Sequence, residues 1–167
     1  MGADTLLNLV TTATVIGGLL FAVFEVRHMS ARRRQSAALT LAKSFQTPEF
    51  ANAIVGVLGI PEGLTRKQLE EKLGEEVDGV WLLMTTWESL GILVHRGELS
   101  LNLVEDFFSG PIVLSWSKFQ RLVDELRVEL DRDTYFEWFQ WLAERVKEGE
   151  SSRPALPAYT EHRIWKR

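Results

Sequence analysis

The sequence contains no cysteine and only three histidines. Without cysteine there are no disulfides, thiolate nucleophiles or cysteine metal ligands, which agrees weakly with a reducing compartment. His28, His95 and His162 lie too far apart in sequence to form a metal-binding pair on one helix, so no metal site is expected. The motifs of serine hydrolases, P-loop proteins and dinucleotide-binding enzymes are also missing. These absences favour a protein that is not an enzyme and holds no cofactor.

Charged residues are missing from one long stretch, between Leu6 and Phe24. About 20 helical residues cross a hydrocarbon core of about 30 Å, so the stretch predicts one transmembrane helix over residues 5–26. A cleaved signal peptide would carry basic residues before the apolar run, whereas here they follow it. A buried core helix is the other alternative, although core helices of small domains seldom stay uncharged over such a length.

The basic residues that flank this stretch all lie on its C-terminal side: Arg27, Arg32, Arg33 and Arg34. The positive-inside rule then predicts a single-pass protein of the cell (inner) membrane, with the N-terminus outside and the following domain in the cytoplasm. The same arginines can bind anionic lipid, at about 1 kcal/mol each near the surface. Inside the stretch, Thr14, Gly18 and Ala22 are spaced four apart, which would let a second helix approach closely.

The net charge of −4 is unevenly distributed along the chain. Residues 1–43 carry +3, residues 44–150 carry −10 and residues 151–167 carry +3. We interpret these segments as the transmembrane helix with a basic extension, a cytoplasmic all-helical domain, and a Pro-rich basic tail. An acidic domain repels nucleic acid over most of its surface, so nucleic-acid binding is not expected.

Apolar residues recur with helical spacing through the middle segment, and no alternating run of β-branched residues predicts a strand. The pattern predicts an all-α protein in which the transmembrane helix continues into a small helical bundle. Thr47 and Thr65 are expected to cap helices, whereas Gly110 and Pro111 predict a break. Lys118 falls on the polar side of the helix that follows the break. The expected helices cover residues 26–43, 48–58, 66–74, 77–95, 101–108, 111–130 and 134–147.

Glu88 and Arg96 fall in an otherwise apolar helix, where a buried charge has to be paired. We interpret them as structural. The alternative is an inter-helix pocket near Glu88, Arg96 and Trp87, as in a small-ligand sensor or an unfamiliar enzyme. Aromatic residues cover most of the helix predicted at 134–147 and are expected in the core. Trp141 and Trp165 are candidates for contact with a partner or the membrane surface.

The order of several segments resembles a family of bacterial membrane proteins, domain-of-unknown-function family 4760. The segments that carry the resemblance are the apolar N-terminal stretch, RRRQ (32–35), SFQTPEF (44–50), IPEGL (60–64), WESLGILVHRG (87–97) and YFEWFQWL (135–142). The resemblance implies one membrane helix and a helical domain, and it supplies no activity, cofactor or catalytic residue. The sequence therefore predicts a membrane-anchored accessory or regulatory subunit that acts through contacts with a protein partner or a second copy of itself.

Overall fold

The computed structural model describes residues 47–152 and 156–164, together with Phe21, Glu25, Lys43 and Phe45. The chain divides into two units, Met1–Ser44 and Phe45–Arg167, and the second is the helical domain. Several predicted features lie outside the described residues. They are the predicted transmembrane helix apart from Phe21 and Glu25, the arginines Arg27, Arg32, Arg33 and Arg34, the small residues Thr14, Gly18 and Ala22, and Trp165.

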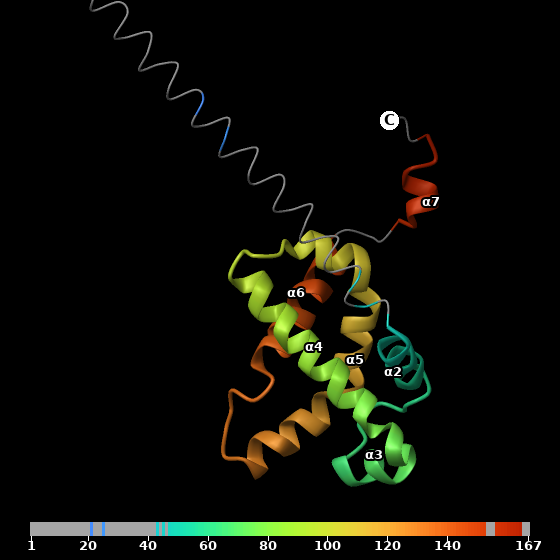
Figure 1. The fold of residues 1–167 in the computed structure, drawn as a ribbon, viewed down its shortest axis with the longest axis vertical. Helices are drawn as coiled ribbons and strands as arrows, with labels where there is room; N and C mark the ends of the chain where they lie inside the picture. The colour runs from blue at the N-terminus through green and yellow to red at the C-terminus, as the bar shows by residue number, and fades with distance from the viewer. Residues whose placement is uncertain are drawn as a thin grey trace, which may run out of the picture. The chain divides into compact units, whose positions relative to one another are not determined.

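The described part of the chain is helical and contains no strand, which confirms the all-α prediction (Figure 1). Its elements are α2 (Pro48–Leu58), α3 (Arg66–Leu73), the 3₁₀ helix η1 (Gly74–Glu76), α4 (Val77–His95), α5 (Leu101–Glu129), α6 (Glu137–Ser152) and α7 (Ala158–Glu161).

Two threonines start α2 and α3, as predicted. The Phe50 backbone N–H donates to Thr47 Oγ1 at 3.2 Å, and Pro48 occupies the first helical position, where its missing N–H costs nothing. At α3, the Gln68 N–H donates to Thr65 Oγ1 while the Thr65 N–H donates to Gln68 Oε1, at 3.2 and 2.9 Å. This reciprocal pair is the capping box that the sequence predicts.

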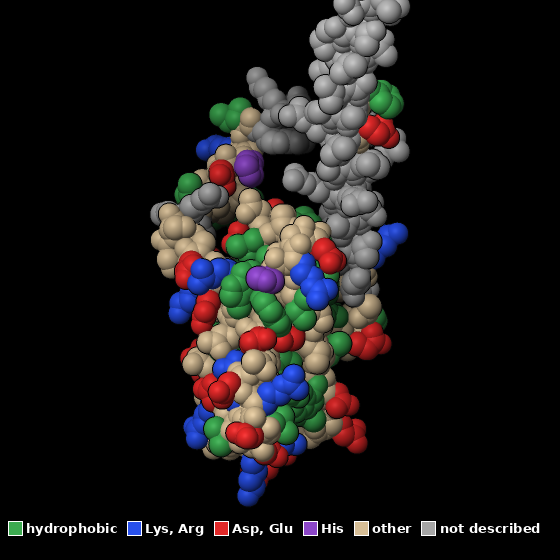
Figure 2. Space-filling model, turned by 90° about the vertical axis from the view of Figure 1, so that its left-hand side faces the viewer, with side chains coloured by type: hydrophobic (Ala, Val, Ile, Leu, Met, Phe, Trp, Pro, Cys, Tyr) green, Lys and Arg blue, Asp and Glu red, His purple; other side chains and the backbone are tan. Residues whose placement is uncertain are grey.

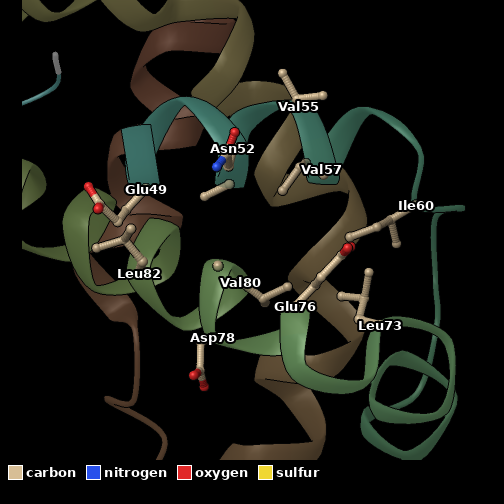
Figure 3. A pocket seen from close by; sticks show the side chains of 13 residues that line it. Glu49, Asn52, Val55, Val57, Ile60, Leu73, Glu76, Asp78, Val80 and Leu82 are labelled. Carbon is tan, nitrogen blue, oxygen red and sulfur yellow. The ribbon is translucent and has the colours of Figure 1, made fainter. Parts of the chain in front are cut away.

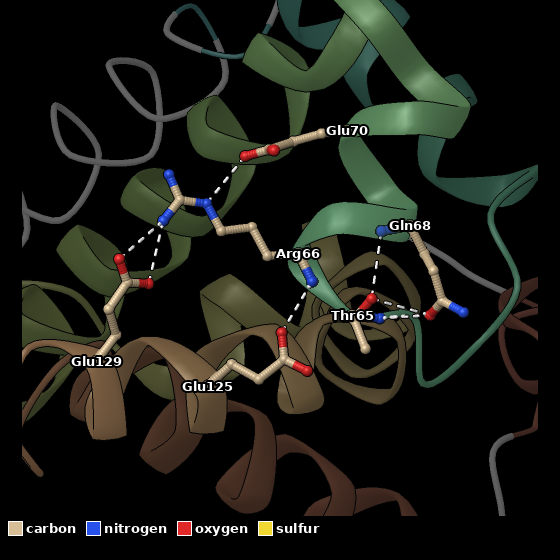
Figure 4. Close-up of polar contacts among 6 residues, drawn as sticks. All are labelled: Thr65, Arg66, Gln68, Glu70, Glu125 and Glu129. Carbon is tan, nitrogen blue, oxygen red and sulfur yellow. Dashed lines mark hydrogen bonds and ion pairs between the residues drawn. The ribbon is translucent and has the colours of Figure 1, made fainter.

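The first turn of α3 is also held by the far end of α5 (Figure 4). The Arg66 backbone N–H donates to Glu125 at 2.9 Å, and the Arg66 guanidinium pairs with Glu129 and with Glu70. These side chains are about half exposed, so solvent screens both ion pairs and their contribution to stability is small. The hydrogen bond to the backbone fixes the position of α3 more than the charges do.

α4 is the central helix and packs against α2, α5 and α6 (Figure 1). Its side chains Leu83, Met84 and Trp87 are fully buried, as are Phe119 of α5 and Phe139 of α6, and all five belong to the core. Burial of a side chain of this size contributes about 1.5–3 kcal/mol, so each of these residues adds substantially to the hydrophobic stabilisation.

Among the described residues, one helical stretch, Arg66–His95, is long and apolar enough to cross a membrane, with a mean hydropathy of 1.2. Central helices of globular bundles have the same composition, because they are apolar on several faces. Here the apolar side chains of α4 already pack on three other helices. The core position of α4 explains its hydropathy.

The predicted break at Gly110 and Pro111 is wrong, because α5 runs through both residues without interruption. A proline inside a helix removes one hydrogen bond, to the carbonyl four residues earlier. That carbonyl belongs to Phe107, which is exposed, as is Gly110, so water can replace the lost donor. Packing along the rest of α5 then outweighs the local cost of Pro111.

Candidate functional site

A close approach of two helices forms the base of an open groove. Gly79, near the start of α4, lies against Ala53 of α2, and a Cβ built on Gly79 would be 3.3 Å from the Ala53 Cβ. Two small residues at the crossing point let the helix backbones come together there. Larger side chains on either side of the crossing then stand apart and leave space between them.

The groove lies between α2, η1 and the first half of α4 and has a volume of about 710 Å³ (Figure 3). Glu49 and Leu82 lie at one end, and Ile60, Leu73 and Glu76 lie at the other. Its side chains are mostly apolar, and two of them remain open to solvent, since Val55 is 66% exposed and Leu82 is 38% exposed. The remaining residues that line it are Asn52, Ala53, Gly56, Val57, Asp78, Gly79 and Val80.

The charged residues of the groove are all acidic: Glu49, Glu76 and Asp78. Each lies in the first turn of a helix, where a carboxylate interacts favourably with the helix dipole. Stabilisation of these helix starts is one role of the three residues, and it also leaves an acidic rim around an apolar floor. Among the residues that the structure describes, no lysine or arginine lines the groove to neutralise this rim.

Sequence patterns alone did not indicate this groove. The signal was present in α2, where PEFANAIVGVL is apolar on more than one face. Phe50, Ala53 and Val57 are buried, whereas Val55 and Leu58 face solvent. A short helix that is apolar beyond its buried face indicates a surface left for another contact.

Glu88, predicted to be a structural charge in an apolar helix, caps the start of α6. Its carboxylate accepts a hydrogen bond of 2.7 Å from the Phe139 backbone N–H, in the first turn of α6. Burial raises the pKa of the Glu88 carboxyl above its ordinary value, and the backbone N–H groups of Phe139 and Trp138 oppose that rise. Arg96 is exposed at the end of α4 and Trp87 is fully buried, so neither residue shares this site with Glu88.

Replacement of Glu88 separates its charge from its capping role. Glu88→Ala should lower the free energy of unfolding by about 1–3 kcal/mol, because the Phe139 N–H loses its acceptor. Glu88→Gln keeps an acceptor and removes the charge. Because the pKa of Glu88 is raised in the folded state, its ionised carboxylate destabilises the fold at neutral pH. This destabilisation disappears at pH values below the ordinary pKa of a glutamate carboxyl.

The stability of the wild type relative to Glu88→Gln should therefore rise as the pH falls from neutral to about 4. Urea unfolding of the full chain in mild detergent, followed by circular dichroism, measures this difference. The pH-dependent contributions of the other carboxylates cancel because both proteins contain them. A fall in relative stability over the same range would mean that the N–H groups of α6 outweigh burial.

The family model described as "Domain of unknown function (DUF4760)" matches residues 12–146 of the chain. The chain belongs to this family. Neither the curated proteins nor the solved structures contain a significant match. The match includes α2 to α5 and most of α6, so the whole groove and the Glu88 cap belong to the DUF4760 domain. The C-terminal tail after Ser152 lies beyond it.

In the DUF4760 domain Lys118 is buried, which corrects its predicted place on a polar face. Its ammonium donates to the Leu58 carbonyl at 3.2 Å and to the Ile60 carbonyl, just where α2 ends. A positive charge at a helix C-terminus interacts favourably with the dipole and satisfies carbonyls that have no helical partner. Lys118 therefore fixes the end of α2, and with it one end of the groove.

The aromatic run of α6 is also partly corrected. Tyr135 and Phe136 precede the helix, which begins at Glu137, because Phe136 adopts a positive φ of 53°. Trp138 is half-buried rather than in the core, and its ring centroid lies 4.6 Å from that of His95. Trp141 is likewise half-buried, edge-on to His95 at 5.8 Å.

Figure 2 shows one face of the molecule, on which small apolar areas lie among side chains of both charges. Such a mixed surface is typical of globular domains and does not by itself indicate a ligand. Within the described ranges, no three histidine or acidic side chains are grouped so that they could hold a metal ion. The groove remains the surface with the clearest chemical character, apolar inside and acidic at its edge.

Proposed function

We propose that the protein is a non-enzymatic, single-pass membrane protein whose helical domain binds a protein partner through the groove of α2, η1 and α4. In this role it is an accessory or regulatory subunit of a membrane assembly. The partner supplies an apolar segment with basic residues, which matches the floor and the rim of the groove. Complementary charge of this kind contributes more to specificity and association rate than to affinity.

The observation that carries the proposal is the apolar lining of the groove together with exposed apolar side chains beside it, Leu82 at one end and Val55 on the solvent side of α2. Pockets for small molecules bury most of the ligand and place several polar groups around it. This groove is open along one side, and its polar side chains stand mainly at the edge. An extended or helical peptide fits such a surface better than a small substrate does.

Membrane attachment in this proposal comes from the uncharged stretch between Leu6 and Phe24. The arginines that follow it place the helical domain in the cytoplasm, next to anionic lipid. The domain would then meet its partner at the membrane surface, where both are confined to two dimensions. Confinement raises the effective concentration of each for the other.

One fusion tests both parts of the proposal. A fluorescent reporter that matures only in the cytoplasm is fused after Arg167, and the full chain is then purified in mild detergent by means of this reporter.

The groove is tested by a variant at Gly56. Gly56 lines the groove, and a Cβ there would meet no described atom within 4 Å, so Gly56→Leu fills the groove without a clash at the backbone. It also raises helix propensity by about 0.8 kcal/mol.

With an untagged copy of the chain co-expressed, we expect a fluorescent fusion and a co-purifying protein, the untagged copy included, that Gly56→Leu reduces at least about tenfold, the effect of losing about 1.4 kcal/mol of binding. The matched control is Gln120→Leu, an exposed helix position on α5 that does not line the groove. A fusion without fluorescence would overturn the proposed orientation, in which the helical domain lies in the cytoplasm. Equal co-purification with both leucine variants would overturn the role of the groove.

A further inference from the structure

The C-terminal tail, residues 151–167, is chemically complementary to the groove. Residues 151–167 carry a net charge of +3, from Arg153, Arg163, Lys166 and Arg167 against Glu161. Three large apolar side chains of the tail are open to solvent, since Leu156, Tyr159 and Ile164 are 62%, 82% and 84% exposed. The tail is thus an apolar and basic segment, which is the chemistry that complements an apolar groove with an acidic rim.

The tail contains a helix that is too short to be stable alone. α7 has four residues, Ala158–Glu161, no side-chain cap at its start and no buried residue. Helices shorter than about 12–15 residues are marginal in water unless they pack against another surface. A surface that covers Tyr159 and Ile164 would supply the stabilisation that α7 lacks.

We propose that the tail of one chain, residues 153–167, docks in the groove of a second copy. This inference rests on the proposed function of the groove and names its partner. The occupant is a second copy because the apolar side chains of the tail are exposed within the single chain. Fully extended, fifteen residues reach about 50 Å, enough to cross to a neighbour held in the same membrane.

Reciprocal exchange of the two tails gives a closed dimer with twofold symmetry. Each copy then offers the same groove and the same tail, so two identical contacts form and no site is left open. Apolar residues of the tail, chiefly Tyr159 and Ile164, lie over the groove side chains that are exposed in the single chain, Val55 and Leu82. The basic residues near the C-terminus lie beside the acidic rim.

The lack of cysteine makes a direct test possible, because any introduced pair is the only pair in the sample. One chain carries Val55→Cys at the edge of the groove, and a second chain, with a different affinity tag, carries Ile164→Cys in the tail. Both are full-length and are reconstituted together in lipid nanodiscs. Under mild oxidation a disulfide forms only if the two Cβ atoms come within about 4.5 Å.

We expect a cross-linked species that contains both tags. The matched control replaces Val55→Cys by Val128→Cys, which is an exposed valine on α5 outside the groove, and should give at least about tenfold less product. Gly56→Leu on the groove chain should reduce the product to a similar extent. Removal of rim charge by Glu76→Gln with Asp78→Asn should lower the rate of cross-linking about threefold to tenfold at low salt, whereas Glu98→Gln with Asp106→Asn should not.

A chain that carries both Val55→Cys and Ile164→Cys completes the test. Closure only within one chain would place the tail in its own groove and overturn the proposed exchange between copies. Absence of product in every combination would exclude the tail from the groove altogether. If no cross-link forms but a protein still co-purifies and depends on Gly56, the proposed function of the groove stands and only the docking of the tail is overturned. If there is neither a cross-link nor a co-purifying protein, both proposals are overturned.

Discussion

Trp87→Ala is expected to lower the free energy of unfolding by about 3–5 kcal/mol, the range for removing a large buried aromatic side chain. Trp87 is fully buried in α4, and its ring lies 5.8 Å from Phe50 of α2 and 5.6 Å from Phe108 of α5, between ring centroids. The loss would affect three helices at once. Since a domain of this size has about 5–15 kcal/mol in total, the variant should unfold at a much lower urea concentration.

Trp87→Phe is the informative comparison. The Trp87 Nε1 atom is buried and has no hydrogen-bond partner within the described part of the chain, so a phenyl ring there loses volume and no described hydrogen bond. We expect a cost of about 1–2 kcal/mol from the smaller cavity. Trp138→Ala should also cost less than Trp87→Ala, because Trp138 is half-buried. Equal losses for both alanine variants in urea unfolding would contradict the position of Trp87 at the centre of the core.

The sequence predicted those parts of the fold that depend on neighbouring residues. The caps at Thr47 and Thr65 are made by residues within three positions, and the bounds of α2 and α4 follow from these and similar local signals. The low helix propensity of proline predicts a helix break at Pro111, but no break occurs there. Packing of α5 against the rest of the bundle outweighs the local free-energy cost of the proline.

The start of α6 illustrates a feature that local patterns cannot show. Its first turn is capped by Glu88, which is 51 residues away in sequence and belongs to another helix. Lys118 likewise satisfies carbonyls at the end of α2, some 60 residues away. In both cases the sequence shows a charged residue on a helix, but its partner depends on the packing of two helices.

The groove could not be predicted from the sequence for a related reason. Val55 and Leu82 have the same apolar character as the core residues beside them, and only the placement of α2 against α4 leaves them exposed. The acidic rim follows from residues that also favour the starts of helices. Each residue is explained locally, whereas the combination of apolar floor and acidic edge exists only in the assembled fold.

Gly91 allows α4 and α6 to approach closely, and Gly91→Ala should therefore be strongly destabilising. A Cβ on Gly91 would lie 2.3 Å from the Trp138 carbonyl oxygen and 2.8 Å from its carbonyl carbon. Both atoms are backbone, so the clash cannot be relieved by rotation of a side chain. The first turn of α6 would have to move, and it is the same turn that donates to Glu88.

We expect Gly91→Ala to lower the free energy of unfolding by about 2–3 kcal/mol, because overpacking costs exceed the gain in helix propensity of about 1 kcal/mol. Gly56→Ala is the matched control. It is also an interior glycine of a helix, and a Cβ there meets nothing within 4 Å, so the same propensity gain should appear as stabilisation. The two variants are then expected to shift the urea midpoint in opposite directions. A stabilising effect of both variants would show that α4 and α6 have room between them at Gly91.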